Sequence, residues 1–148
     1  MLRGAWPIVI AACAALTACL DDEQALRSDE PSYTMVFFAS DSVALNKRAK
    51  DQLGHTVSNP TPPIKAALQP NSKAKICVTG HTDKVGPETM NKEIAQRRAD
   101  AVAKYLVELG VPQQRIVTAS LGSSKPLVVT APGTPELSNR RVEVVFGC

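Results

Sequence analysis

The strongest constraint on the fold of this chain is an alternation of short β-branched or aromatic segments with longer amphipathic ones. Residues of high strand propensity predict strands over 33–38, 75–80, 115–121 and 141–146. Apolar residues at helical spacing predict helices over 45–53 and 91–109. Because helices separate the strands, this βαβαββ order predicts an α/β domain with helices packed on a partly parallel sheet.

Both predicted helices have recognisable ends. Asp41 and Ser42 offer a cap before the first helix, and Gly54 with the prolines beyond it predicts the end. The segment 64–68 fits one further helical turn. Gly110 is placed to end the longer helix. The apolar face of that helix consists of Ile94, Ala95, Ala99, Val102, Leu106 and Leu109.

Composition limits the functions open to this domain. The 148 residues carry 17 Lys and Arg against 14 Asp and Glu, and the net charge of +3 is too small for a dedicated nucleic-acid binder. The sequence has no internal period, which excludes a repeat protein. His81 has no partner at metal-ligand spacing and His55 is far from it, so neither a metal nor a cofactor is expected.

The first nineteen residues have the features of a secretory signal. Arg3 is the only charged residue among them, and the apolar run after it is shorter than the ~20 residues that a membrane-spanning helix needs. Residues 16–19, of sequence LTAC, resemble the lipobox of bacterial lipoproteins. This resemblance implies removal of residues 1–18 as a signal peptide and acylation of Cys19. The alternative is an ordinary signal cleavage that releases a soluble periplasmic protein.

The residues after Cys19 bear on location. By resemblance to lipoproteins, a residue other than aspartate directly after the acylated cysteine permits sorting to the outer membrane. Leu20 stands at that position, so the resemblance implies a lipid anchor in the outer membrane and a domain that faces the periplasm. Residues 19–33 are rich in Asp, Glu and Ser, which predicts a flexible tether and leaves residues 34–148 as the folded domain.

Three groups of polar residues interrupt the apolar pattern. Residues 81–83, His-Thr-Asp, stand where a predicted strand ends, and residues 139–141, Asn-Arg-Arg, come directly before the last strand. Arg98 lies one helical turn from apolar residues on either side. Because an unpaired buried charge is very costly, Arg98 must find an anion or reach the rim of a pocket.

Taken in order, these residues resemble the OmpA-like peptidoglycan-binding domain, over 35–146. The resemblance implies a two-layer βαβαββ sandwich, with two helices on a mixed four-stranded sheet whose last strand is antiparallel. It also implies a ligand, the meso-diaminopimelate of uncrosslinked peptidoglycan stems, whose free end carries an ammonium and a carboxylate. The residues that carry the resemblance are 38–45, 80–83, Gly86, Asn91, Arg98, Ala99, Val102, Leu106, Gly110, Pro126 and 139–144.

The resemblance implies a role for each matching residue of the ligand site. Asp83 matches an aspartate that accepts hydrogen bonds from the ammonium. Arg98 matches an arginine whose planar guanidinium binds the carboxylate. Asn91 and Thr82 are expected to shape the pocket, and Asp41 to add a polar contact from the loop after the first strand.

Further residues are expected to support the pocket without touching the ligand. Arg140 is expected to brace it, and His81 to be a packed or hydrogen-bonded residue at the strand end. Arg141 alternates with apolar neighbours and is expected to be solvated. The alternative for the central pair is a salt bridge between Asp83 and Arg98 that joins helix to sheet and binds nothing; a ligand that replaces this bridge would reconcile the two interpretations.

Two cysteines remain in the predicted domain, Cys77 and Cys148. An oxidising periplasm favours their pairing, and the family's strand order implies that their strands are antiparallel neighbours. Against a bridge, Cys77 points opposite to the apolar residues beside it, whereas Cys148 shares parity with Val144. Gly147 could let the terminus turn across, so the disulfide is left open at this point.

The sequence therefore predicts a non-enzymatic lipoprotein that binds peptidoglycan and tethers the outer membrane to the cell wall. The alternative is an envelope interaction protein of the Tol-associated type, whose main role is to dock other envelope proteins. A wall hydrolase is disfavoured, because His81 and Asp83 lie two apart on one strand and cannot orient each other with a serine.

Overall fold

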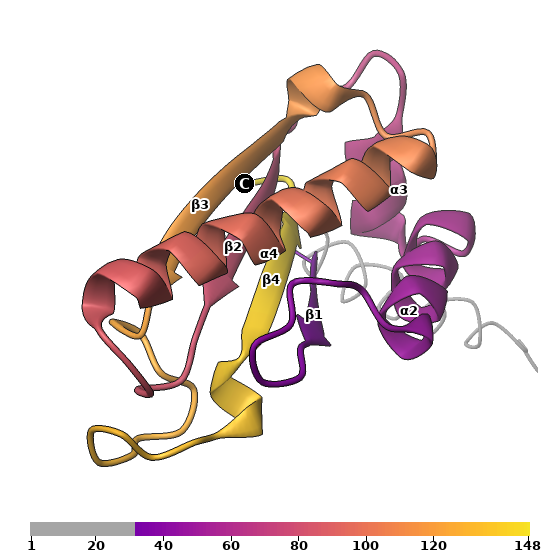
Figure 1. Ribbon diagram of the computed structural model, residues 1–148. Helices are drawn as coiled ribbons and strands as arrows, with labels where there is room; N and C mark the ends of the chain where they lie inside the picture. Colours follow the sequence, from indigo (N-terminus) through magenta and orange to yellow (C-terminus); the bar gives the residue numbers. More distant parts are fainter. Residues whose placement is uncertain (1–31) are drawn as a thin grey trace, which may run out of the picture. The chain divides into compact units, whose positions relative to one another are not determined.

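The structure is a computed structural model that describes residues 32–148. Four strands form one sheet in the order β1-β4-β2-β3; β4 is antiparallel to both of its neighbours, and β2 and β3 are parallel (Figure 1). This arrangement confirms the predicted two-layer α/β class and the antiparallel last strand. The elements are β1 (Ser32–Phe37), α2 (Lys47–Ser58), α3 (Pro62–Leu68), β2 (Ile76–His81), α4 (Glu88–Glu108), β3 (Ile116–Gly122) and β4 (Arg141–Phe146), with short 3-10 helices at Gln113–Arg115 and Leu137–Asn139.

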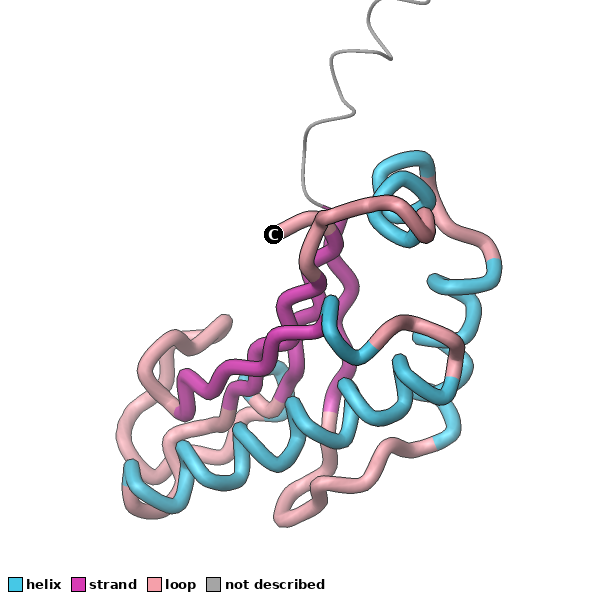
Figure 2. The backbone as a smooth tube through the Cα atoms, turned by 90° about the horizontal axis from the view of Figure 1, so that it is seen from above, coloured by secondary structure: helices cyan, strands magenta, loops and turns pink. Residues whose placement is uncertain are grey.

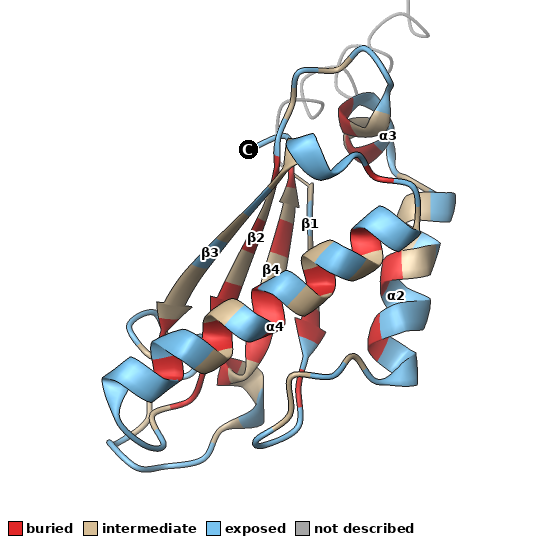
Figure 3. Cartoon of the chain, turned by 45° about the horizontal axis from the view of Figure 1, so that its top comes forward, coloured by how far each residue is buried: buried red, intermediate tan, exposed pale blue. Residues whose placement is uncertain are grey.

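The helices lie on one face of the sheet (Figure 2). The core lies between them, where the buried residues of the strands and of α4 face one another (Figure 3). Alternate residues of the central strands point toward α4 and are buried, and the predicted apolar face of α4 covers them. Burial of such side chains contributes ~1.5–3 kcal/mol each. The cluster includes Val36, Ile76, Val78, Ala99, Val102, Leu106, Val142, Val144 and Phe146.

The helices differ from the sequence prediction in number and in their ends. The expected cap at Asp41 is wrong: α2 begins later, where the Asn46 side chain accepts a hydrogen bond from the Ala49 amide. The helix also continues through Gly54, because the cost of one glycine, about 1 kcal/mol, is smaller than the gain from packing Leu53 and Val57 on the core. The single helical turn expected over 64–68 belongs to a further short helix, α3.

A close approach of two backbones fixes the position of α4 over the sheet. Gly80 of β2 lies against Ala95, and a Cβ at Gly80 would overlap the Ala95 carbonyl. Glycine is therefore required here by the lack of space. Since Arg98 follows Ala95 by three residues, about one helical turn, this contact brings the arginine to the end of β2.

The opposite end of the sheet is closed by the C-terminus. Gly147, with φ of 84°, turns the chain so that both its amide and that of Cys148 donate to the Lys75 carbonyl. A disulfide joins Cys77 to Cys148, with Cα atoms 6.0 Å apart. We call this region, with the start of β3, the closed end.

The described part of the chain begins inside the expected tether. β1 begins at Ser32, so the last two residues of the expected tether belong to the sheet. The expected signal peptide and lipidation at Cys19 lie outside the described residues. Within 32–148, no helix has the length and apolarity needed to cross a bilayer.

Candidate functional site

A cavity of about 120 Å³ lies at the end of the sheet away from the closed end. It is bounded by the loop after β1, the end of β2, the first half of α4 and the segment before β4. Six of the residues singled out in the sequence line it: Asp41, Thr82, Asp83, Asn91, Arg98 and Arg140. The sequence analysis did not assign the other lining residues to the ligand site; these are Ser40, Val85, Ile94 and Pro135.

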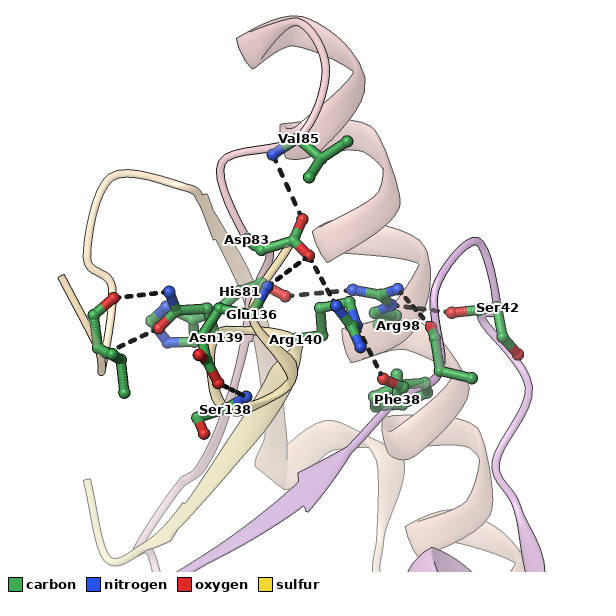
Figure 4. A network of polar contacts seen from close by, with 12 residues as sticks. Phe38, Ser42, His81, Asp83, Val85, Arg98, Glu136, Ser138, Asn139 and Arg140 are labelled. Carbon is green, nitrogen blue, oxygen red and sulfur yellow. Dashed lines mark hydrogen bonds and ion pairs between the residues drawn. The ribbon is translucent and has the colours of Figure 1, made fainter. Parts of the chain in front are cut away.

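Arg98 is the most completely buried charge that borders this cavity, with 1% of its surface exposed. Its guanidinium is held by three backbone carbonyls: Nε donates to Ser42 at 2.9 Å, Nη2 to Ala39 at 3.1 Å and Nη1 to His81 at 3.5 Å (Figure 4). The Phe38 ring lies 5.3 Å from its central carbon. The chain therefore fixes both the position and the plane of the guanidinium.

Arg98 keeps unused hydrogen-bonding capacity. A guanidinium has five N–H donors, and the three carbonyls use one on each nitrogen. The second N–H of each terminal nitrogen has no protein acceptor among the described residues. Burial lowers the pKa of Arg98, and nearby Arg140 lowers it further, while the carboxylates of Asp83 and Asp41 act in the opposite direction. The group is thus a confined cation that an anion would stabilise.

The ion pair of Asp83 is made with Arg140 and not with Arg98. Arg140 Nη1 lies 2.8 Å from Asp83 Oδ2, and Arg140 Nε donates to the Phe38 carbonyl at 3.3 Å. Backbone amides of Val85 and Glu136 also donate to the Asp83 carboxylate, at 3.4 and 3.3 Å. The direct salt bridge considered from the sequence is therefore wrong, because the segment before β4 supplies a nearer cation.

Three further lining residues add polar groups, two of them buried and one at the rim. Thr82 is 3% exposed, and its hydroxyl has no hydrogen-bond partner although its amide donates to the Gly122 carbonyl. A buried hydroxyl without a partner indicates a place where a ligand or water supplies one. Asn91 is buried and donates to the Gly86 carbonyl at 3.4 Å. Asp41 is exposed at the rim, in a left-handed turn with φ of 55°.

The arrangement places a buried guanidinium and a carboxylate around one small cavity. The first can bind a carboxylate through two parallel hydrogen bonds, and the second can accept from an ammonium. In comparisons with known proteins, the family described as the OmpA family matches residues 37–143. The chain belongs to the OmpA family.

Relatives within the OmpA family agree with this assignment. The peptidoglycan-associated lipoprotein of Buchnera aphidicola is 43% identical over 79 residues, which is 51% of this chain and 44% of that protein. The outer-membrane lipoprotein YfiB of Pseudomonas aeruginosa is 32% identical over 108 residues, 73% of this chain and 64% of the relative. The chain thus spans less than two thirds of either relative.

A solved structure shares the OmpA-family fold seen here. The peptidoglycan-associated lipoprotein from Burkholderia pseudomallei superposes with a TM-score of 0.63 at 27% sequence identity, over 75% of this chain and 87% of that one.

Behind the cavity of this OmpA-family domain, on the other face of the sheet, lies a second polar cluster. His81 is 2% exposed, with neither ring nitrogen hydrogen-bonded, and its Nε2 is 3.8 Å from Glu143. Arg141 Nη2 lies 2.6 Å from the same carboxylate and also donates to the Lys125 carbonyl. Arg141 is therefore buried and not solvated as expected, because the segment at Lys125 covers this end of β4.

One positioning residue carried only a weak sequence signal. Asn139 is fully buried, and its side-chain amide pairs with both backbone groups of Val128, each at 2.8 Å (Figure 4). This clamp holds the long β3–β4 connection beside Arg140. The Asn-Arg-Arg run pointed to the segment, but the partner of Asn139 lies eleven residues away and could not be read from it.

Proposed function

We propose that this domain binds peptidoglycan through the free end of meso-diaminopimelate in uncrosslinked stem peptides. The observation that carries the proposal is Arg98, a buried guanidinium with two unused N–H groups beside a cavity that also exposes part of Asp83. The names of two relatives, both peptidoglycan-associated lipoproteins, support peptidoglycan as the partner.

The chemistry of the ligand matches the two sides of the cavity. The free end of diaminopimelate carries a carboxylate and an ammonium on one carbon. Arg98 would take the carboxylate with a bidentate pair. Asp83, which Arg140 already holds in place, would accept from the ammonium, and the unpartnered Thr82 hydroxyl would accept a further hydrogen bond. The proposed role is binding, with no bond made or broken.

We also propose that the chain is an outer-membrane lipoprotein, acylated at Cys19. The family includes lipoproteins of the outer membrane, and β1 begins at the end of the sheet opposite the cavity, which suits an anchor on one side and a wall ligand on the other. The test is cell fractionation. Cys19→Ala should lower the share of the protein that is found in the outer-membrane fraction. An unchanged distribution would contradict lipidation at Cys19.

Binding is tested by co-sedimentation of the mature chain with purified peptidoglycan sacculi. Asp83→Asn removes the acceptor charge, so its binding should fall at least about tenfold, the loss of one charged hydrogen bond in a buried site. Asp100→Asn makes the same chemical change at an exposed position of α4 and should bind as the wild type does. Free meso-diaminopimelate should compete for the wild-type site. Equal pull-down of both variants would remove the proposed site.

Docking of other envelope proteins is the alternative function, and the same variants separate the two. Crosslinking in intact cells should trap the wall in preference to protein partners, and Asp83→Asn should abolish that product. A protein crosslink that persists in Asp83→Asn, with no wall product in the wild type, would favour the docking role.

A further inference from the structure

We propose that the cavity selects stems whose diaminopimelate carries a free carboxylate and rejects stems in which that carboxyl is a carboxamide. This inference rests on the proposed function and specifies its ligand. It follows from the kinds of hydrogen-bonding groups that the Arg98 side of the cavity presents.

That side of the cavity presents donors. Arg98 has a spare N–H on each terminal nitrogen, and the carbonyls of Ala39, Ser42 and His81 that surround it already accept from the guanidinium. Arg140 also lines the cavity, and its Nη2 makes no hydrogen bond among the described residues. A carboxylate has only acceptors and can satisfy these donors. A carboxamide satisfies them through its oxygen alone, and its NH₂ group meets further N–H groups.

The arginine cannot adapt to a carboxamide. Three carbonyls and the Phe38 ring fix the guanidinium plane. Turning it by the amount needed would break these hydrogen bonds inside a buried site. A guanidinium also cannot become an acceptor, because it does not lose its proton in proteins. An asparagine or glutamine at this position could invert its amide to suit either ligand, whereas Arg98 cannot.

The acceptors of the cavity cannot relieve the mismatch, because they serve the ammonium of the same carbon. The Asp83 carboxylate, the Thr82 hydroxyl and the Asn91 amide oxygen are the buried side-chain acceptors of the lining. A carboxamide NH₂ that turned toward them would compete with the ammonium for the same oxygens. Amidation also removes the anion that offsets the charge of buried Arg98.

The test measures binding of three synthetic tripeptides, L-Ala-γ-D-Glu-meso-diaminopimelate and two amidated forms, to the mature chain by isothermal titration calorimetry. One form is amidated at the diaminopimelate carboxyl on the carbon that carries the free ammonium, with the other carboxyl of that residue unchanged. The control form is amidated at the glutamate α-carboxyl, which changes net charge equally but leaves the zwitterion intact. We expect the first amide to weaken binding about tenfold to a hundredfold, the loss of one charged hydrogen bond with a donor left unpaired. The control amide should bind within about twofold of the parent.

The outcomes separate this inference from the function on which it rests. Equal affinity of the parent and the diaminopimelate amide would overturn the selectivity while leaving peptidoglycan binding in place. Equal weakening by both amides would assign the effect to net charge and also overturn it. If the parent tripeptide and sacculi both fail to bind, the proposed function itself fails.

Discussion

Two arginines at opposite ends of the sheet are both held by backbone carbonyls, but they differ in how many of their N–H groups remain unused. At the closed end, Arg115 donates to the carbonyls of Ala67, Gln69 and Ala74. At the cavity end, Arg98 donates to three other carbonyls. Each guanidinium supplies hydrogen-bond donors to backbone carbonyls that a loop would otherwise leave without partners.

The difference lies in what each arginine has left. Arg115 makes four hydrogen bonds, and both N–H groups of its Nη2 are used. Arg98 makes three, and its two free N–H groups lie beside a cavity with an unpartnered hydroxyl and a carboxylate. A cage of carbonyls around an arginine therefore indicates a structural role. Unused donors at a cavity indicate a binding role in addition.

The largest expected effect comes from opening the closed end. Replacing Cys77 and Cys148 together with alanine removes a link between residues 71 apart, which should lower the free energy of unfolding by about 3–4 kcal/mol. Urea denaturation of the oxidised protein measures the change, and a reductant should affect the wild type alone. Affinity for the diaminopimelate tripeptide should stay within about twofold. A large loss of affinity would show that the two ends are not independent.

The second effect is confined to the cavity end. Arg98→Lys keeps the charge but loses the planar fork, and a buried ammonium cannot reach three carbonyls and a ligand carboxylate together. Tripeptide binding should weaken at least about thirtyfold, equivalent to ~2 kcal/mol. Arg97→Lys makes the same substitution at the neighbouring exposed position and should change neither binding nor stability measurably. Equal binding by both variants would contradict the role given to Arg98.

The third effect reverses the pattern of the second. Arg115→Lys leaves backbone carbonyls of the 67–74 segment without their donors, and should destabilise the domain by about 1–2 kcal/mol. Because Arg115 lies at the end of the sheet opposite the cavity and does not line it, tripeptide affinity should be unchanged under conditions where the variant is folded. Thermal unfolding and calorimetry on the same sample give both values. A binding defect without a loss of stability would reverse the assignment of the two arginines.

The sequence predicted the layers and the sheet better than it predicted the hydrogen bonds and ion pairs of the site. Strand propensity located every strand, and helical spacing located the long helix, because each buries an apolar face. Helical spacing gave only one helical turn over 64–68, where α3 has seven residues, because so short a helix has no clear period. The cage around Arg98 left no signal, since backbone carbonyls have none in the sequence. The pairing of Asp83 with Arg140 joins residues 57 apart and follows only from the three-dimensional fold.

The smallest expected effect concerns His81, which lies behind the cavity and whose carbonyl accepts from Arg98. Burial lowers the pKa of His81, the Arg141 cation lowers it further, and the Glu143 carboxylate acts against both, with Lys125 as the remaining charged neighbour. The folded domain therefore binds this proton less readily than the unfolded chain. Its contribution to stability is complete above pH ~6.5, the ordinary histidine value, and is lost as the pH falls toward the lowered pKa.

Comparison with a variant isolates this contribution from that of the carboxylates. The free energy of unfolding of the wild type, from urea denaturation, should fall more steeply between pH 7 and 5 than that of His81→Gln, by about 1.4 kcal/mol for each pKa unit that separates the folded and unfolded states. His55→Gln, a change at an exposed position of α2, should keep the wild-type slope. Parallel slopes for wild type and His81→Gln would mean that Glu143 offsets the burial of the ring.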